Sequence, residues 1–296
     1  MNPLVSICCL TYNHESYIRQ CLDGFLFQQT NFTFEILLHD DASTDNTANI
    51  IREYESKYPD LIKPIYQTEN QYSKGVGISV VYQFPRAKGK YIALCEGDDY
   101  WTDPYKLQKQ VDFLEANPSF SLSFHKAKVL SEGILHTELY AHLEEREYFG
   151  KEIFDNWTIP TCSVLFRNNF KIRIPKSILF GDIYLFLLIL NQGKAYCHGF
   201  EGSVYRRNNG GASVNPSVST IKKLFFQYKY MSEYFPDYKE ISKRKMNNYL
   251  DQLIYAPFFK GIWKFRLYKM LQEPKLFFSS FFTTTLTSYI FQRNKK

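Results

Sequence analysis

Apolar and polar residues alternate in two different patterns along the first 215 residues. Short apolar runs of strand length recur, and polar turns and stretches with apolar residues at helical spacing separate several of them. The expected strands are Leu4–Leu10, Phe34–Leu38, Leu61–Gln67, Tyr91–Cys95, Ser121–His125 and Ser163–Arg167, and the expected helices are Tyr17–Phe27, Ala48–Tyr58 and Asp182–Leu190. Strands that alternate with helices in this way predict βαβ units. We therefore expect an α/β fold with a mainly parallel sheet flanked by helices.

The pattern changes near Asn215–Pro216. Three stretches of helical spacing then follow one another without intervening strands, at Ile221–Phe235, Lys239–Leu253 and Phe258–Leu271. We therefore expect two domains. Residues 1–215 form the α/β domain, and residues 216–296 form a helical C-terminal extension.

The charge of the chain changes at the same place. Residues 1–219 carry 21 basic and 25 acidic side chains, whereas residues 220–296 carry 15 basic and 5 acidic ones among many Phe and Tyr. A basic, aromatic helical region has three interpretations: a solvated helical face, a nucleic-acid contact or a membrane contact. No nucleic-acid motif accompanies it. We favour a membrane surface, because anionic lipids attract such helices by about 1 kcal/mol per basic residue.

The chain shows no obvious targeting or cross-linking signal. Its N-terminal apolar run lacks the basic residues of a signal peptide, and no stretch reaches the ~18 apolar residues of a membrane span. The six cysteines form no C-x-x-C pair, which disfavours a thiolate zinc site. We expect a cytoplasmic protein that contacts the inner face of the membrane if the extension binds lipid.

Carboxylates follow two of the predicted strands directly. Asp40 and Asp41 come after the second strand, and Glu96, Asp98 and Asp99 come after the fourth. In an open α/β sheet, ligands bind outside the carboxyl ends of the strands, so both groups are expected in one crevice. Clustered carboxylates repel one another unless a cation lies between them. The pattern therefore indicates a divalent metal site.

Three motifs together resemble a known family. They are Val5-Ser-Ile-Cys-Cys-Leu-Thr-Tyr-Asn13, Glu35-Ile-Leu-Leu-His-Asp-Asp-Ala-Ser-Thr-Asp-Asn-Thr47 and Ala87-Lys-Gly-Lys-Tyr-Ile-Ala-Leu-Cys-Glu-Gly-Asp-Asp-Tyr-Trp101. Their order and spacing look like those of family 2 glycosyltransferases over residues 3–215. The resemblance implies the GT-A fold, which is Rossmann-like, and transfer of a sugar from a nucleotide-diphospho-sugar.

The resemblance places the nucleotide at the first two strand ends. Asp41 matches the carboxylate that reads uracil, with Asp40 beside it, and a carboxylate is a suitable acceptor for an imide N–H. Thr11, Asn13 and Glu15 are expected to border the base and ribose. The alternative for Asp41 is helix capping, because the segment after it is also a good turn and N-cap sequence.

The segment Glu96-Gly97-Asp98 stands where the family has Asp-x-Asp. The resemblance implies that Asp98, together with Glu96, binds the donor diphosphate through Mg²⁺ or Mn²⁺. Such an ion neutralises charge on the departing nucleoside diphosphate. Glu96 departs from the family pattern, since an Asp is usual there.

An inverting transferase needs a base that takes the proton from the acceptor hydroxyl. The family places a carboxylate some way after the metal motif, at the start of a helix, and Asp182 fits this position. It is the sole acidic residue between Asp155 and Glu201. The alternative is an ordinary N-cap aspartate.

Five further residues are expected near the donor or the acceptor. Arg206 and Arg207 are expected at the diphosphate, although Asn208 and Asn209 replace the histidine that is frequent in the family. Trp101 is a wall of the sugar subsite or simple packing. Trp157 and Thr161 line the acceptor site or a packed loop.

The sequence thus predicts an inverting, metal-dependent glycosyltransferase that moves a sugar to a hydroxyl of a glycan or lipid-linked acceptor, in surface polysaccharide biosynthesis. A UDP-sugar is favoured as donor by family prevalence. The alternative is a non-catalytic nucleotide-binding or membrane-adaptor protein that keeps the fold. Glu96 and residues 77–81, which replace the common Ala-Arg-Asn, point toward this alternative.

Overall fold

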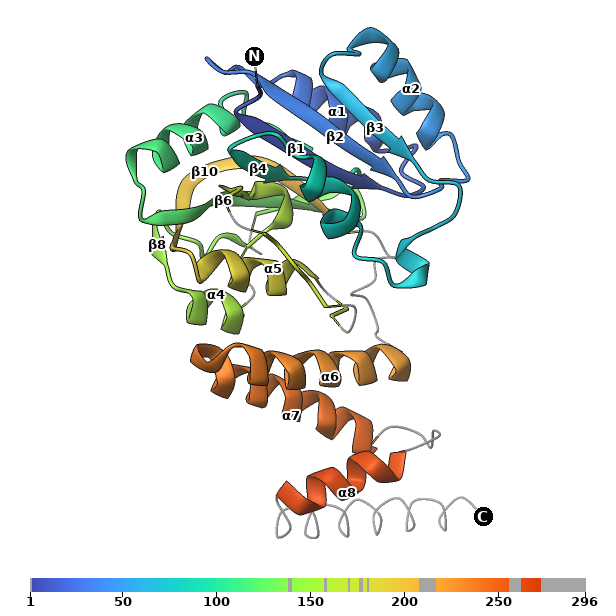
Figure 1. The fold of residues 1–296 in the computed structure, drawn as a ribbon, viewed down its shortest axis with the longest axis vertical. Helices are drawn as coiled ribbons and strands as arrows, with labels where there is room; N and C mark the ends of the chain where they lie inside the picture. Colours follow the sequence, from blue (N-terminus) through green and yellow to red (C-terminus); the bar gives the residue numbers. More distant parts are fainter. Residues whose placement is uncertain are drawn as a thin grey trace. The chain divides into compact units, whose positions relative to one another are not determined.

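The computed structural model describes residues 2–137, 140–156, 159–169, 171–175, 178–179, 181–207, 217–255 and 262–272. The chain divides into two compact units, Met1–Val214 and Asn215–Lys296. Figure 1 shows both. Each is described by itself below. No helix in the described ranges is long and apolar enough to cross a membrane.

The first unit is built on one mixed sheet. Its described strands are β1 (Val5–Thr11), β2 (Phe34–Asp40), β3 (Ile62–Tyr66), β4 (Tyr91–Leu94), β5 (Tyr100–Trp101), β6 (Phe120–Ser131), β7 (Ile134–His136), β8 (Arg146–Tyr148), β9 (Leu165–Arg167) and β10 (Lys194–Arg207). The order is β3-β2-β1-β4-β9-β6-β10-β5, with β7 paired to β6 and β8 to β10. Strands β3, β2, β1 and β4 are parallel to one another, which places their carboxyl ends at one edge.

Helices cover this sheet. They are α1 (Ile18–Leu26), α2 (Thr47–Lys57), α3 (Lys106–Ala116), α4 (Gly150–Asn156) and α5 (Gly181–Leu190). Figure 1 draws α1, α2 and α3 on one side of the sheet and α4 and α5 on the other. Strand β1 is buried along almost its whole length, because a parallel strand covered on both faces needs apolar residues on both. The predicted α/β fold, with a largely parallel sheet flanked by helices, is confirmed.

The second half of the sheet differs in detail from the sequence prediction. Strand β9 runs antiparallel to both of its neighbours, β4 and β6. The longest strand, β10, was not predicted, because charged residues such as Glu201 interrupt its apolar pattern. Its register against β6 shifts around Glu201, which is typical of a bulge. The end of this strand places Arg206 beside the carboxylate loop, which is the part of the chain after β4 that contains residues 96–99.

The second unit contains α6 (Val218–Tyr234), α7 (Lys239–Tyr255) and α8 (Ile262–Gln272). Ser217 caps the N-terminus of α6, because its Oγ accepts the backbone N–H of Thr220 at 3.2 Å. The helices pack through buried apolar side chains, including Leu250 on α7. The rings of Phe225 and Phe265 join α6 to α8, with centroids 5.4 Å apart in an edge-to-face arrangement.

Candidate active site

The loop after β4 lies very close to the end of β1. The backbone N–H of Gly97 donates to the carbonyl of Leu10 at 2.8 Å. A Cβ added to Gly97 would lie 2.9 Å from Thr11 Oγ1 and 3.0 Å from His14 Nδ1. Only glycine allows this approach. Thr11 Oγ1 and His14 Nδ1 are themselves buried without a hydrogen-bond partner, so polar groups are available beside the carboxylate loop.

Three carboxylates from two distant segments come together at this edge. The pKa of Glu96 is raised to about 7, chiefly by burial among the surrounding residues and in addition by the negative charges of Asp98 and Asp182. The Glu96 side chain is nevertheless exposed to solvent. The pKa of Asp182 is raised to about 6 by burial. The repulsion that Asp98 and Asp182 exert on Glu96 is expected where carboxylates lie near one another.

Asp182 lies in the first turn of α5, one residue inside the helix rather than at the N-cap. The backbone N–H of Ile183 donates to its Oδ1 at 2.9 Å. This bond lowers the pKa of Asp182 and only partly offsets the effect of burial. A carboxylate with a raised pKa at a helix N-terminus is suited to hold and release a proton near neutral pH.

Asp99 and Arg206 attach the loop after β4 to the end of β10. Asp99 is buried, and its Oδ1 accepts the backbone N–H of Arg206 at 2.7 Å. The Arg206 guanidinium donates to the carbonyl oxygen of Asp98 and to Gln20 Oε1. It also lies 4.6 Å from the ring centroid of Tyr100. Arg206 therefore has a structural role in this loop, and its contact with a diphosphate stays a prediction. Arg207 ends β10 and is exposed.

The residues after β1 are tied to the loop after β2. Asn13 adopts a left-handed backbone conformation (φ 55°), and its Oδ1 accepts the backbone N–H of Thr44 at 2.8 Å. Glu15 Oε2 accepts the backbone N–H of Asn46 at 2.9 Å. The predicted residues Thr11, Asn13 and Glu15 thus lie beside the end of β2, and their contact with a nucleotide stays a prediction.

Asp40 and Asp41 are both buried and already hydrogen-bonded. Asp40 Oδ1 accepts the hydroxyl of Ser43 at 2.5 Å. Asp41 accepts two backbone N–H groups, from Gln71 to Oδ1 at 2.8 Å and from Tyr72 to Oδ2 at 3.0 Å. A carboxylate has about four acceptor sites, so Asp41 keeps capacity for a further donor. Its assignment to uracil stays a prediction.

The three residues assigned to the sugar or acceptor subsite have different positions. Trp101 is 3% exposed, its indole N–H donates to the carbonyl of Cys162 at 2.8 Å, and its ring packs edge-on against Phe25. These contacts show that Trp101 packs inside the first unit, and its place in the sugar subsite stays a prediction. Thr161 begins a short 3₁₀ helix, Thr161–Ser163, and is partly exposed. Trp157 lies outside the described residues.

Two residues near the site were missed by the sequence analysis. His14 Nε2 lies 4.0 Å from Asp98 Oδ2. Tyr72 is 54% exposed. The partial burial of its hydroxyl is the largest cause that raises the pKa of Tyr72, and the charges of Glu96 and Asp182 raise it further. His14 lies between two residues that the sequence analysis did select, which is a usable signal. Tyr72 gives no such signal, because only the fold brings it near Asp182.

A comparison with family models identifies the family of the chain. The model of the family "Glycosyl transferase family 2" matches residues 6–171, more than half of the sequence. The chain belongs to glycosyl transferase family 2. The resemblance to this family that the sequence motifs indicated is thus confirmed.

Two relatives illustrate the range of the family members that match. The uncharacterized protein Rv1520 of Mycobacterium tuberculosis is 37% identical over 227 residues, which cover 75% of this chain and 64% of that protein. This chain therefore matches less than two thirds of that relative's length. WfaP of Escherichia coli, a UDP-Glc:alpha-D-GlcNAc-diphosphoundecaprenol beta-1,3-glucosyltransferase, is 29% identical over 221 residues, which cover 74% of this chain and 84% of that protein.

A solved structure supports the fold. S. aureus TarS 1–349 in complex with UDP-GlcNAc superimposes with a TM-score of 0.63, covering 91% of this chain and 77% of that one. The identity is 20%, so the likeness concerns the fold alone.

Proposed function

We propose that this chain is an inverting, metal-dependent transferase. It moves a sugar from a nucleotide-diphospho-sugar to a hydroxyl of a glycan or lipid-linked acceptor, in surface polysaccharide biosynthesis. One observation carries the proposal: the charges of Asp98, in the same loop, and of Asp182, from a distant helix, both help to raise the pKa of Glu96 after burial, at the carboxyl edge of the sheet. A UDP-sugar is the favoured donor, in keeping with the UDP-GlcNAc bound by TarS and the UDP-Glc in the name of WfaP.

The donor set suits a divalent metal ion, although no group of three or more His, Cys, Asp or Glu within the described ranges is arranged to hold one already. Carboxylate oxygens are the ligands that Mg²⁺ and Mn²⁺ prefer. Burial is the largest cause of the raised pKa of Glu96, and the negative charges of Asp98 and Asp182 add a repulsion that a cation would relieve. Asp98 and Glu96 would hold the ion, which would supply positive charge to the donor diphosphate.

Asp182 is proposed as the base. Its carboxylate takes the proton from the acceptor hydroxyl while that oxygen forms a bond to the anomeric carbon. The bond from this carbon to the phosphate oxygen breaks, and the nucleoside diphosphate leaves with the electron pair. Attack opposite to the leaving group inverts the anomeric centre, which parallels inverting hydrolysis with an alcohol in place of water.

The ends of β1 and β2 are proposed to hold the nucleoside. Thr11, Asn13, Glu15, Asp40 and Asp41 border this crevice. The free acceptor capacity of Asp41 supports contact with the base, and the exposed Arg207 supports contact with the diphosphate. Thr161, which is partly exposed next to β9, is retained as an acceptor-side residue.

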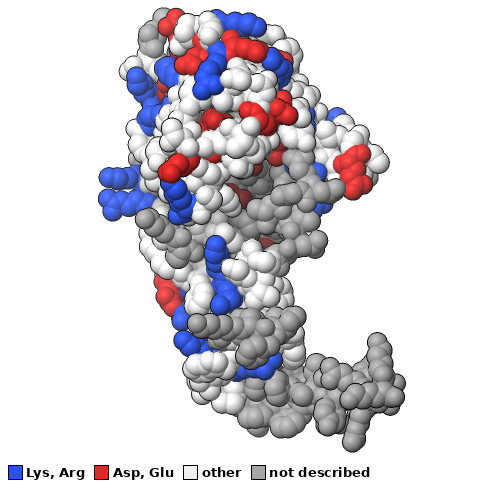
Figure 2. Space-filling view, turned by 90° about the vertical axis from the view of Figure 1, so that its right-hand side faces the viewer, with Lys and Arg blue, Asp and Glu red and all other residues white. Residues whose placement is uncertain are grey.

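The C-terminal unit is proposed to contact an anionic membrane surface. Trp263, Leu267 and Leu271 are exposed on α8. Their spacing of four residues puts them on one face of the helix. Figure 2 shows Lys and Arg side chains gathered over the helices of this unit. An apolar stripe within a basic surface is typical of helices that lie in the membrane interface.

The function is tested with Asp98→Ala and Asp182→Ala in a sugar-transfer assay with a panel of UDP-, GDP- and dTDP-sugars. Asp112→Asn, a carboxylate on the exposed face of α3, is the control and keeps full activity. We expect both test variants to lose transfer. Full activity in both would refute the proposal, and nucleotide binding by the wild type without transfer to any acceptor would favour the non-catalytic alternative.

A further inference from the structure

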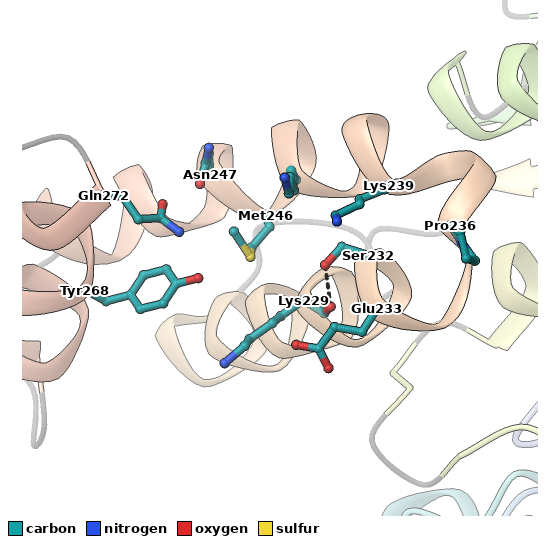
Figure 3. A pocket seen from close by; sticks show the side chains of 10 residues that line it. Lys229, Ser232, Glu233, Pro236, Lys239, Met246, Asn247, Tyr268 and Gln272 are labelled. Atoms are coloured by element: carbon teal, nitrogen blue, oxygen red, sulfur yellow. Dashed lines mark hydrogen bonds between the residues drawn. The ribbon is translucent and has the colours of Figure 1, made fainter.

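The C-terminal unit contains a cavity of its own. It lies between α6, α7 and α8 and has a volume of about 650 Å³. Figure 3 shows the side chains of Met246, Tyr268 and Lys239 directed toward this space. Cavities of roughly 300–1,000 Å³ hold organic ligands rather than single ions. No function described above uses this cavity.

Lysines dominate the charged lining of the cavity. Lys229, Lys239 and Lys243 line it, against Glu233 as the one acidic lining residue among those described. Lys243 pairs with Glu240 at 3.5 Å on the surface. No carboxylate in the described part of the chain pairs with Lys229 or Lys239. The cavity therefore has an excess of positive charge, which favours an anionic ligand.

A second observation concerns the neutral part of the lining. Asn247 lines the cavity, and its Oδ1 is buried without a hydrogen-bond partner. A buried acceptor without a donor costs about 1–3 kcal/mol. A ligand that carries a hydroxyl would satisfy this oxygen. The Tyr268 ring and Met246 add apolar contact area that a bare anion cannot use.

We propose that this cavity binds a hydroxyl-bearing phosphate ester. The lysines meet the phosphate, and Asn247 Oδ1 accepts a hydrogen bond from a ligand hydroxyl. Two sources share this chemistry: a soluble polyol or sugar phosphate, and the glycerol phosphate headgroup of an anionic lipid. The proposal does not depend on the proposed transferase function, because every carboxylate of the candidate active site lies in the other unit.

The soluble source is tested by calorimetry of the full chain with glycerol 3-phosphate and with inorganic phosphate. We expect saturable binding of glycerol 3-phosphate that is about tenfold weaker, or more, in Lys239→Gln/Lys243→Gln. The matched control Lys223→Gln/Lys264→Gln removes the same charge from exposed positions that do not line the cavity and keeps wild-type binding. The Asp98→Ala variant also keeps it, which separates this site from the donor site.

Asn247→Leu tests the neutral contact. It removes the acceptor while it roughly keeps the side-chain volume. We expect it to weaken glycerol 3-phosphate binding several-fold, toward that of inorganic phosphate, and to leave inorganic phosphate unaffected. Equal losses for both ligands would contradict the role of Asn247, and circular dichroism of each variant confirms that the helices are retained.

The lipid source is tested with phosphatidylcholine vesicles with and without phosphatidylglycerol. Binding to phosphatidylglycerol vesicles without binding of glycerol 3-phosphate assigns the cavity to a headgroup, provided that Lys239→Gln/Lys243→Gln weakens it more than the control pair. The proposal is overturned if neither ligand binds, or if the cavity variant and the control pair weaken binding equally.

Discussion

Asp99 Oδ1 accepts the backbone N–H of Arg206 at 2.7 Å, and this bond joins the carboxylate loop after β4 to the end of β10. The two residues are 107 positions apart in the sequence. The Arg206 guanidinium makes a second hydrogen bond to this loop, because it donates to the carbonyl of Asp98. Asp98, a proposed metal ligand, therefore lies on a loop that two hydrogen bonds attach to Arg206 of β10.

This relationship predicts a difference between two substitutions of Asp99. Asp99→Ala removes the acceptor and leaves the Arg206 N–H buried and unpaired, so we expect the free energy of unfolding to fall by about 1–3 kcal/mol. Asp99→Asn keeps an oxygen at Oδ1. Burial, Asp98 and Glu96 raise the pKa of Asp99 well above its usual range, so the neutral amide resembles the protonated acid, and we expect little change. Urea unfolding measures both, and equal losses would contradict the connection.

Trp101 is predicted to affect stability rather than donor binding. Its ring is buried between Phe25 and the ammonium of Lys106, which lies 4.2 Å from the ring centroid. Trp101→Phe keeps most of this packing but loses the bond to Cys162. We expect a lower free energy of unfolding, by about 1–3 kcal/mol, with the KM for the donor within about twofold of wild type. A large rise in the KM for the donor, without a loss of stability, would instead assign Trp101 to the sugar subsite.

Asp182 is predicted to act on the chemical step and not on nucleotide binding. Asp182→Asn keeps the shape of the side chain but cannot take a proton. We expect kcat to fall by about 10²–10⁴, with the Kd for the nucleoside diphosphate unchanged. Calorimetry and initial rates on the same preparation separate the two quantities. A weakened Kd with an unchanged kcat would assign Asp182 to binding.

The transfer rate is expected to depend on pH through the ionisation of Asp182. The pKa of Asp182 is raised to about 6 by burial, and the deprotonated carboxylate is the form that acts as a base. The rate is therefore expected to fall as the pH drops through about 6 and to level off above it. Initial rates at saturating donor between pH 5 and pH 8 measure this, and a rate independent of pH in that window would exclude Asp182 as the base.

The apolar stripe on α8 is predicted to contribute to membrane binding. Leu267→Glu/Leu271→Glu places two charges on this face and should lower binding to vesicles that contain phosphatidylglycerol by at least about tenfold. The control Ile134→Glu/Leu135→Glu makes the same change at two exposed apolar residues of the first unit. Sedimentation with vesicles measures both, and equal effects of the two variants would refute the membrane contact.

The sequence allowed the parallel half of the fold to be predicted because its signals are local. Strand β1 and helix α1 appear where apolar runs and helical spacing place them, to within about two residues. The antiparallel strand β9 has three residues, too few for its direction to be inferred. The polar residues of β10 concealed a strand whose pairing partners lie far away in the sequence.

The candidate site was predicted in part for the same reason. Glu96 and Asp98 follow a clear strand, so their position at the sheet edge could be inferred. The hydrogen bonds of Asp41 to residues 71 and 72 could not be inferred, because they depend on how a distant loop folds back. Tyr72 likewise approaches the site only through that loop.

The central claim is that the carboxylates at the end of β4 bind a nucleoside diphosphate through a divalent cation. Calorimetry of UDP, GDP and dTDP with and without Mn²⁺, on the wild type and on Asp98→Asn, tests it most directly. The account predicts that Mn²⁺ strengthens binding of one diphosphate, with UDP favoured, and that Asp98→Asn removes the effect of the metal. Binding that is the same with and without Mn²⁺ would contradict it.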